Sequence, residues 1–182
     1  MFVEFFMRNY LRKAIFLDKD GTLVDNSLYP VVIPSDKILK NEIVDGLLYL
    51  QKKGYVFIII SNQSWIAKGR MTMSEVEAVF RSVCLQLEAY GIFITAYYYC
   101  PHQRSDNCQC KKPKTYLVEK AALEHDLDLS QSFMIGDMDD DIVMGKAMGL
   151  KTVQVLTGKS MFRLESCADY VIQNINNVRE VI

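Results

Sequence analysis

The sequence predicts an α/β fold in which a parallel sheet is covered by helices on both faces. Short apolar runs alternate with longer segments of helical periodicity, which is the pattern of consecutive βαβ units. Polar residues directly follow several apolar runs, at the edge where open α/β sheets bind ligands. The chain has 182 residues, which fits a single domain because domains hold about 150 residues.

The first half of the chain begins with a strand, a helix and a second strand. The apolar run Ala14–Leu17 predicts the first strand, and Tyr55–Ile60 predicts the second. Between them, Glu42–Lys53 has helical periodicity and ends at Gly54, a residue type that tolerates the left-handed conformation at helix ends. These three segments therefore form one expected βαβ unit.

The next helix has clear signals at both ends. Ser74–Tyr90 is periodic, and either Thr72 or Ser74 can cap its first turn. Glu75 suits the positive end of the helix dipole, and Gly91 provides the stop.

The second half of the chain repeats this alternation. The expected strands are Ile94–Tyr99, Ser132–Ile135, Thr152–Leu156 and Tyr170–Ile172. The expected helices are Thr115–Asp126 and Asp140–Met148, and the second of them ends at Gly149. Residues 1–12 form an N-terminal extension to which the sequence assigns no role.

The composition excludes two classes of protein. Lys and Arg number 21 against 22 Asp and Glu, so the chain lacks the basic excess of a general nucleic-acid binder. No apolar run approaches the ~20 residues that cross a bilayer. The basic residues near the N-terminus follow its apolar residues, the reverse of the order in a signal peptide. We therefore expect a cytoplasmic protein without nucleic-acid or membrane partners, and we favour a monomer.

Polar residues that could bind a cation and a phosphate follow three of the expected strands. Asp18 and Asp20 leave the first strand at positions i and i+2, so they can share one cation. Ser61-Asn62-Gln63-Ser64 follows the second strand and could hold a phosphate. Gly136-Asp137 opens an acidic cluster that extends to Asp141 and favours a metal ion. Taken singly, each group has an alternative interpretation: an Asp-Gly turn, a helix N-cap and a solvated acidic turn.

The long connection at residues 100–114 carries the most specific local pattern. Cys100 and His102 form one pair, and Cys108 and Cys110 form a second with the same spacing. Two such pairs can close a tetrahedral zinc site in which every ligand is a protein side chain, which is typical of structural zinc. Chance clustering of reduced cysteines is the alternative. A zinc ion here would fix the loop and position Lys111 and Lys112.

The combination of motifs resembles that of the haloacid dehalogenase-like phosphatases. The four motifs of that family correspond to Asp18-Lys19-Asp20-Gly21-Thr22, Ser61, Lys112, and Gly136-Asp137 with Asp141. The resemblance covers the chain from about Lys13 to Thr157. It implies a Rossmann-like sheet with a zinc-stabilised loop and no large cap domain.

The resemblance also implies a role for each motif residue. Asp18 would be the nucleophile that forms an aspartyl-phosphate, and Asp20 the general acid and base. Mg²⁺ would be held by the Asp18 carboxylate, the Asp20 main-chain carbonyl and Asp137. Asp141 would lie behind these ligands as a partner of Lys112. The substrate, a small phosphate ester, would contact Ser61, Asn62, Gln63, Ser64, Lys111, Lys112, Asn26 and Tyr29.

Within the family, the chain looks like the subgroup of the D-glycero-D-manno-heptose 1,7-bisphosphate phosphatases and the histidinol-phosphate phosphatases. The stretch 62–70 resembles the heptose enzymes, whereas the short gap between His102 and Cys108 resembles the histidinol-phosphate enzymes. Lys111 stands where the heptose group usually has arginine, and Met138 where it tends to have lysine. We expect a heptose bisphosphate or a related sugar phosphate, with histidinol phosphate as the alternative.

A signalling domain of the receiver type offers a more distant alternative. Receiver domains also combine an aspartate nucleophile, Mg²⁺, a hydroxyl and a lysine, but their acceptor aspartate follows the third strand. Here the third strand ends at Tyr99-Cys100, which does not supply that aspartate. A binding protein with a decayed active site is a third alternative, and the complete set of motif residues argues against it.

Overall fold

The computed structural model describes residues 11–25, 38–158 and 166–182, and its centre is a six-stranded parallel sheet. The strands lie in the order β3-β2-β1-β4-β5-β6. Their bounds are β1 Ala14–Leu17, β2 Val56–Asn62, β3 Ile94–Cys100, β4 Phe133–Gly136, β5 Lys151–Val155 and β6 Tyr170–Ile172. The predicted α/β class and parallel sheet are confirmed.

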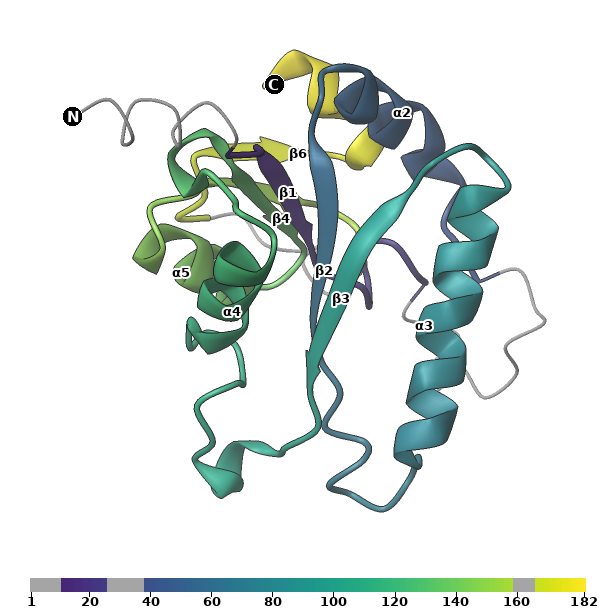
Figure 1. Ribbon diagram of the computed structural model, residues 1–182, viewed down its shortest axis with the longest axis vertical. Helices are drawn as coiled ribbons and strands as arrows, with labels where there is room; N and C mark the ends of the chain where they lie inside the picture. Colours follow the sequence, from purple (N-terminus) through teal and green to yellow (C-terminus); the bar gives the residue numbers. More distant parts are fainter. Residues whose placement is uncertain (1–10, 26–37, 159–165) are drawn as a thin grey trace.

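Helices cover both faces of this sheet (Figure 1). Alternate residues of a strand point to opposite faces, so Ile15 and Leu17 join the core under one layer while Ala14 and Phe16 join the core under the other. The first layer contains α2 (Val44–Lys52) and α3 (Met73–Glu88), together with the 3-10 helix η7 (Ile175–Glu180). The second layer contains α4 (Tyr116–Glu124) and α5 (Asp139–Ala147). Two further 3-10 segments are η4 (Arg104–Asp106) and η5 (Leu129–Gln131). Among the described residues, every helix is too short or too polar to cross a bilayer.

With one exception, the predicted elements agree with the structure apart from shifts at their ends. Helix α3 begins after Thr72, whose side chain and that of Glu75 form a capping box. Gly54, Gly91 and Gly149 all have the positive φ expected at helix ends, at 84°, 76° and 71°.

One predicted helix is interrupted. The segment expected at Glu42–Lys53 begins as a separate 3-10 turn, η3 (Asn41–Ile43), because Glu42 has a non-helical backbone conformation. The C-terminal helix η7, which was not predicted, packs against α2 at Gly46. A Cβ atom at Gly46 would lie 2.1 Å from the Ile175 carbonyl oxygen, so only glycine permits this approach.

The order of the strands brings distant parts of the chain to one edge of the sheet. β1 lies between β2 and β4, and the chain crosses from one side of β1 to the other after β3. The segments that follow β1, β2 and β4 therefore leave the sheet side by side. In open α/β sheets, such a change of direction opens a crevice for a ligand.

Candidate active site

A cavity of about 430 Å³ lies at this edge of the sheet. Its size is within the usual range of small-molecule sites, roughly 300–1,000 Å³. Most of its wall comes from the segments that follow β1, β2 and β4, with one residue from the loop after β3. The lining residues are Asp18, Asp20, Ser61, Asn62, Ser64, Trp65, Lys68, Lys112, Asp137, Met138, Asp140 and Asp141.

A buried lysine connects two of the acidic residues in this cavity. Lys112 Nζ lies 2.6 Å from Asp18 Oδ1 and 2.6 Å from Asp141 Oδ1, and it donates to the Ile60 carbonyl at 2.8 Å. Burial alone would lower the pKa of Lys112, but the carboxylates of Asp141 and Asp18 outweigh burial and raise that pKa above its usual range. Lys112 therefore stays charged and is the partner that the sequence analysis assigned to Asp141.

The acidic cluster fits a hard divalent cation. One carboxylate oxygen from each of Asp18, Asp137 and Asp141 lies within 4.8 Å of the others, and all three residues are buried. When ionised, they carry three negative charges against the single charge of Lys112, so the cluster has an excess of negative charge away from water. Burial raises the pKa of Asp18 well above its usual value, against the opposing effect of Lys112. A cation bound to these oxygens would favour the ionised form of Asp18.

Glycine at position 136 allows the acidic cluster to be this compact. A Cβ atom there would lie 2.4 Å from Asp141 Cγ, a distance that real side chains do not adopt. Asp141 Oδ2 also accepts a hydrogen bond from the Met138 backbone N–H at 3.1 Å, which anchors the start of α5. Local packing thus requires glycine at position 136 and places Asp141 against it.

The second aspartate of the first motif has a different environment. Lys19 Nζ forms an ion pair with Asp20 Oδ1, and Gln63 Nε2 donates to Asp20 Oδ2 at 2.7 Å and to Ser61 Oγ at 2.8 Å. Lys19 is 1% exposed and its ammonium lies 5.5 Å from the centroid of the Phe80 ring. The Asp20 carboxylate is therefore held at both oxygens at the rim of the cavity. This contact of Lys19 was not predicted from the sequence.

Asn62 positions the lysine of the third motif. Its Oδ1 accepts from the Lys112 backbone N–H at 3.0 Å, and its Nδ2 donates to the Lys112 carbonyl at 3.3 Å. These two hydrogen bonds join the end of β2 to the loop that follows β3. They fix the backbone from which the Lys112 side chain reaches Asp18.

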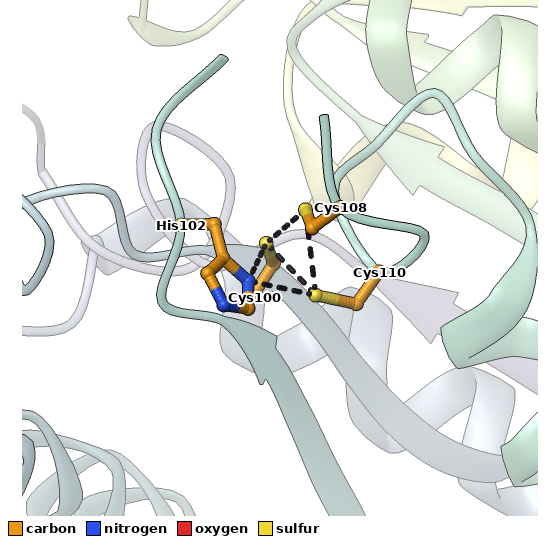
Figure 2. Close-up of side chains that lie close together, drawn as sticks. All are labelled: Cys100, His102, Cys108 and Cys110. Atoms are coloured by element: carbon orange, nitrogen blue, oxygen red, sulfur yellow. Dashed lines mark hydrogen bonds between the residues drawn. The ribbon is translucent and has the colours of Figure 1, made fainter. Parts of the chain in front are cut away.

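The predicted cysteine and histidine pairs come together in one cluster (Figure 2). Cys100 Sγ lies 3.5 Å from Cys108 Sγ and 3.1 Å from Cys110 Sγ, and His102 Nδ1 lies 3.3 Å from Cys110 Sγ. In a tetrahedral site with Zn–S bonds of ~2.3 Å, the sulfur atoms are separated by ~3.8 Å. Burial raises the pKa of Cys100 and Cys110, whereas at Cys108 the hydrogen bonds with these two residues and with backbone groups outweigh burial and lower the pKa to about 7. The four side chains fit a zinc ion by their proximity and by their sulfur and nitrogen donor atoms.

The cysteine and histidine loop is hydrogen-bonded to the segment that follows β2. The carbonyl oxygens of three successive residues accept hydrogen bonds from that segment: Cys100 from Gln63 N at 2.7 Å, Pro101 from Ala67 N at 3.2 Å and His102 from Ser64 Oγ at 3.0 Å. In Figure 1, the two segments extend together beyond the sheet. The loop therefore supports one wall of the cavity.

The remaining predicted substrate contacts are placed differently. Lys111 Nζ donates to Ser64 Oγ at 2.5 Å and to the His102 carbonyl at 3.3 Å, and Lys111 is not among the residues that line the cavity. Asn26 and Tyr29 lie outside the described residues. Trp65 and Lys68 line the cavity although neither was a predicted site residue, and Asp140 lines it as a member of the predicted acidic cluster. The signal available for Trp65 and Lys68 was their position directly after the second motif.

Comparisons with known proteins agree with this geometry. The HAD-hydrolase-like family model matches residues 109–178. The chain is 33% identical over 173 residues to a D-glycero-beta-D-manno-heptose-1,7-bisphosphate 7-phosphatase from Haemophilus ducreyi, covering 90% of this chain and 94% of that protein. It is 36% identical over 148 residues to the histidine biosynthesis bifunctional protein HisB of Legionella pneumophila, covering 80% of this chain but 42% of that protein.

A solved structure supports the fold. The crystal structure of D,D-heptose 1,7-bisphosphate phosphatase from B. bronchiseptica, complexed with magnesium and phosphate, aligns with a TM-score of 0.82. The alignment covers 92% of this chain and 96% of that protein at 24% identity.

Proposed function

This chain belongs to the haloacid dehalogenase-like phosphatases, and on that premise we propose that it hydrolyses D-glycero-D-manno-heptose 1,7-bisphosphate or a related sugar phosphate. The observation that carries the proposal is the cluster in which Asp18, Lys112 and Asp137 meet at one cavity. The similarity to heptose bisphosphate phosphatases over nine-tenths of the chain supports the choice of substrate.

We propose that Asp18 and Asp137, with the main-chain carbonyl of Asp20, hold Mg²⁺. The ion would supply positive charge that offsets repulsion between the Asp18 carboxylate and the anionic ester. The fit rests on the excess negative charge of the cluster and on the oxygen donors that Mg²⁺ prefers.

In the first half of the reaction, a carboxylate oxygen of Asp18 attacks phosphorus and the bond to the leaving oxygen breaks. Lys112 holds Asp18 Oδ1 and also contributes charge to the phosphoryl oxygens, together with the hydroxyl of Ser61. Asp20 donates its proton to the leaving alkoxide. The products of this step are a free alcohol and an aspartyl-phosphate on Asp18.

In the second half, Asp20 removes a proton from water and the resulting hydroxide attacks the same phosphorus. The bond to Asp18 breaks, which releases inorganic phosphate and restores both carboxyl groups. Lys19 and Gln63 hold the Asp20 carboxylate through both steps, so the same group acts as acid and then as base.

We further propose that Cys100, His102, Cys108 and Cys110 bind a structural zinc ion, with all four ligands supplied by the protein. Such a thiol site suits a reducing compartment, and we place the enzyme in the cytoplasm as a monomer. We also propose that the substrate contacts Lys111, Asn26 and Tyr29.

Phosphate release in the presence of Mg²⁺ tests the proposed function. The substrates are the two anomers of heptose bisphosphate, histidinol phosphate and a small generic phosphomonoester. We expect the highest kcat/KM on one heptose anomer and its loss, by about 10³-fold or more, in Asp18→Asn. Asp45→Asn, an exposed carboxylate on α2, serves as the matched control and should keep full activity.

The outcomes separate the parts of the proposal. Undiminished turnover by Asp18→Asn would overturn the mechanism. Preference for histidinol phosphate would overturn the heptose assignment but not the phosphatase activity. Such a preference would agree with the similarity to the bifunctional histidine biosynthesis protein.

A further inference from the structure

Most of the residues that line the cavity have polar or charged side chains, which makes the exceptions informative. Aspartates, Ser61 and Lys112 account for the metal ion and the transferring phosphoryl group. These residues do not account for the other half of the substrate, the leaving group. Trp65 is the one aromatic residue among the described residues that line the cavity.

Trp65 has contacts through both its backbone and its ring. The Trp65 carbonyl accepts hydrogen bonds from the backbone N–H groups of Arg70 at 2.9 Å and Met71 at 3.3 Å, which closes a tight turn. The Arg70 guanidinium lies 4.6 Å from the centroid of the ring, and the partly buried indole packs against the main core. These contacts restrict the orientation of the indole before substrate arrives, so less conformational entropy is lost when a ligand contacts it.

The surroundings of Trp65 define the chemistry that it could recognise. Its neighbour Ser64 is tied to His102 and Lys111, so the wall on that side is also rigid. Lys68, exposed and on the same turn, lines the cavity with Trp65 and adds a positive charge. A rigid aromatic surface beside a cation suits a leaving group that has an apolar C–H face as well as polar or anionic substituents. Carbohydrate rings have this character, since their axial C–H groups form such a face.

We propose that Trp65 is a specificity-determining residue, and that its indole contacts the C–H face of the carbohydrate leaving group. This inference rests on the proposed function and adds a residue to it. The phosphoryl group at Asp18 fixes one end of the ester, and Trp65 fixes the orientation of the ring at the other. Binding energy from this distant contact raises the rate of the chemical step for a ring-bearing ester.

Substitution at Trp65 tests the inference through a comparison of two substrates. We expect Trp65→Ala to lower kcat/KM for heptose bisphosphate by about 10-fold, because the apolar area that the indole buries against the sugar ring is lost. The same variant should change kcat/KM for glycerol 2-phosphate, which has no ring, by less than about 2-fold. Trp65→Phe should recover much of the loss. Phe93→Ala, which removes an exposed aromatic ring outside the cavity, is the matched control.

Fluorescence supplies a second measurement that does not depend on turnover. The chain has a single tryptophan, so emission excited at a wavelength that tyrosine does not absorb reports on Trp65 alone. In the Asp18→Asn variant, heptose bisphosphate should produce a saturable change in emission, and inorganic phosphate should produce a much smaller one.

The outcomes distinguish this inference from the proposed function. If wild-type protein does not hydrolyse the heptose ester, the proposed function fails first. If wild-type protein is active, equal losses on both substrates in Trp65→Ala would show a structural role and overturn the inference. Unchanged kcat/KM on the heptose ester, or emission that does not respond to it, would overturn the inference as well.

Discussion

At the scale of single residues, Lys112 is the group on which the acidic cluster depends. It is 4% exposed and contacts both Asp18 and Asp141 at 2.6 Å. We expect Lys112→Met to lower kcat by about 10³-fold, because the charge that faces the phosphoryl oxygens is lost. In metal-free protein, the substitution should also lower the free energy of unfolding by about 3 kcal/mol, because the buried carboxylates of Asp18 and Asp141 lose the ammonium group that offsets their charge. Phosphate-release assays and urea unfolding measure the two effects.

Lys120→Met is the control for this prediction. Lys120 lies on the outer surface of α4 with its side chain 43% exposed, and its contact with Glu124 is 3.9 Å long. Its replacement should change the free energy of unfolding by less than about 0.5 kcal/mol. A Lys112→Met protein that is as stable and active as Lys120→Met would contradict the role given to the buried lysine.

The sequence located the acidic residues of the site more readily than the residues that support them. Asp18, Ser61 and Asp137 each follow an apolar strand, a position that is visible in the sequence. Lys19 is a charged residue between two aspartates, and its burial against Phe80 depends on how α3 packs over β3. Tertiary packing of this kind leaves no periodic signal, so the ion pair between Lys19 and Asp20 could not be predicted.

At the scale of elements, the cysteine and histidine loop links metal binding to the cavity wall. We expect the protein to contain about one zinc ion per chain and Cys108→Ser to lose most of it. Because the carbonyls of Cys100, Pro101 and His102 hold the segment after β2, the variant should also lose activity, by about 10-fold or more. Metal analysis by mass spectrometry and kcat/KM measure these two losses.

Cys167→Ser is the matched control, since Cys167 is exposed and distant in sequence from the cluster. It should retain zinc and activity. Full zinc content in Cys108→Ser would show that this cluster does not bind the zinc ion. Loss of zinc without any loss of activity would show that the hydrogen bonds from the loop are not needed to shape the cavity.

The elements themselves were largely predictable, and the errors have a common cause. Strands β1 and β6 have the predicted bounds because apolar runs define them, and α3 begins at the cap that Thr72 provides. The break before α2 lies beside η7, which contacts both η3 and α2. η7 packs on α2 where Gly46 leaves room for the Ile175 carbonyl, and a contact between residues so far apart in sequence cannot be deduced from local periodicity.

At the scale of the whole molecule, the order of the strands assembles the site. Asp18, Lys112 and Asp137 belong to segments that are far apart in sequence, and they meet because β1 has β2 on one side and β4 on the other. The folded chain therefore brings several negative charges together in a buried place, where their repulsion opposes folding. A cation that binds only the folded protein should offset this repulsion.

Thermal unfolding with and without Mg²⁺ tests this link between the site and global stability. At a Mg²⁺ concentration 100 times its Kd, binding should stabilise the fold by about 2.7 kcal/mol and raise Tm by roughly 5–10 °C. In Asp137→Asn, the repulsion is smaller and a metal ligand is lost, so Tm in chelator should be equal to or above the wild-type value. The increase on adding Mg²⁺ should then shrink to less than about 2 °C.

Ca²⁺-free buffer with Na⁺ at matched ionic strength controls for general screening, which should affect both proteins alike. If the variant responds to Mg²⁺ as fully as the wild type, Asp137 is not a ligand, because a cation held elsewhere would be indifferent to that carboxylate.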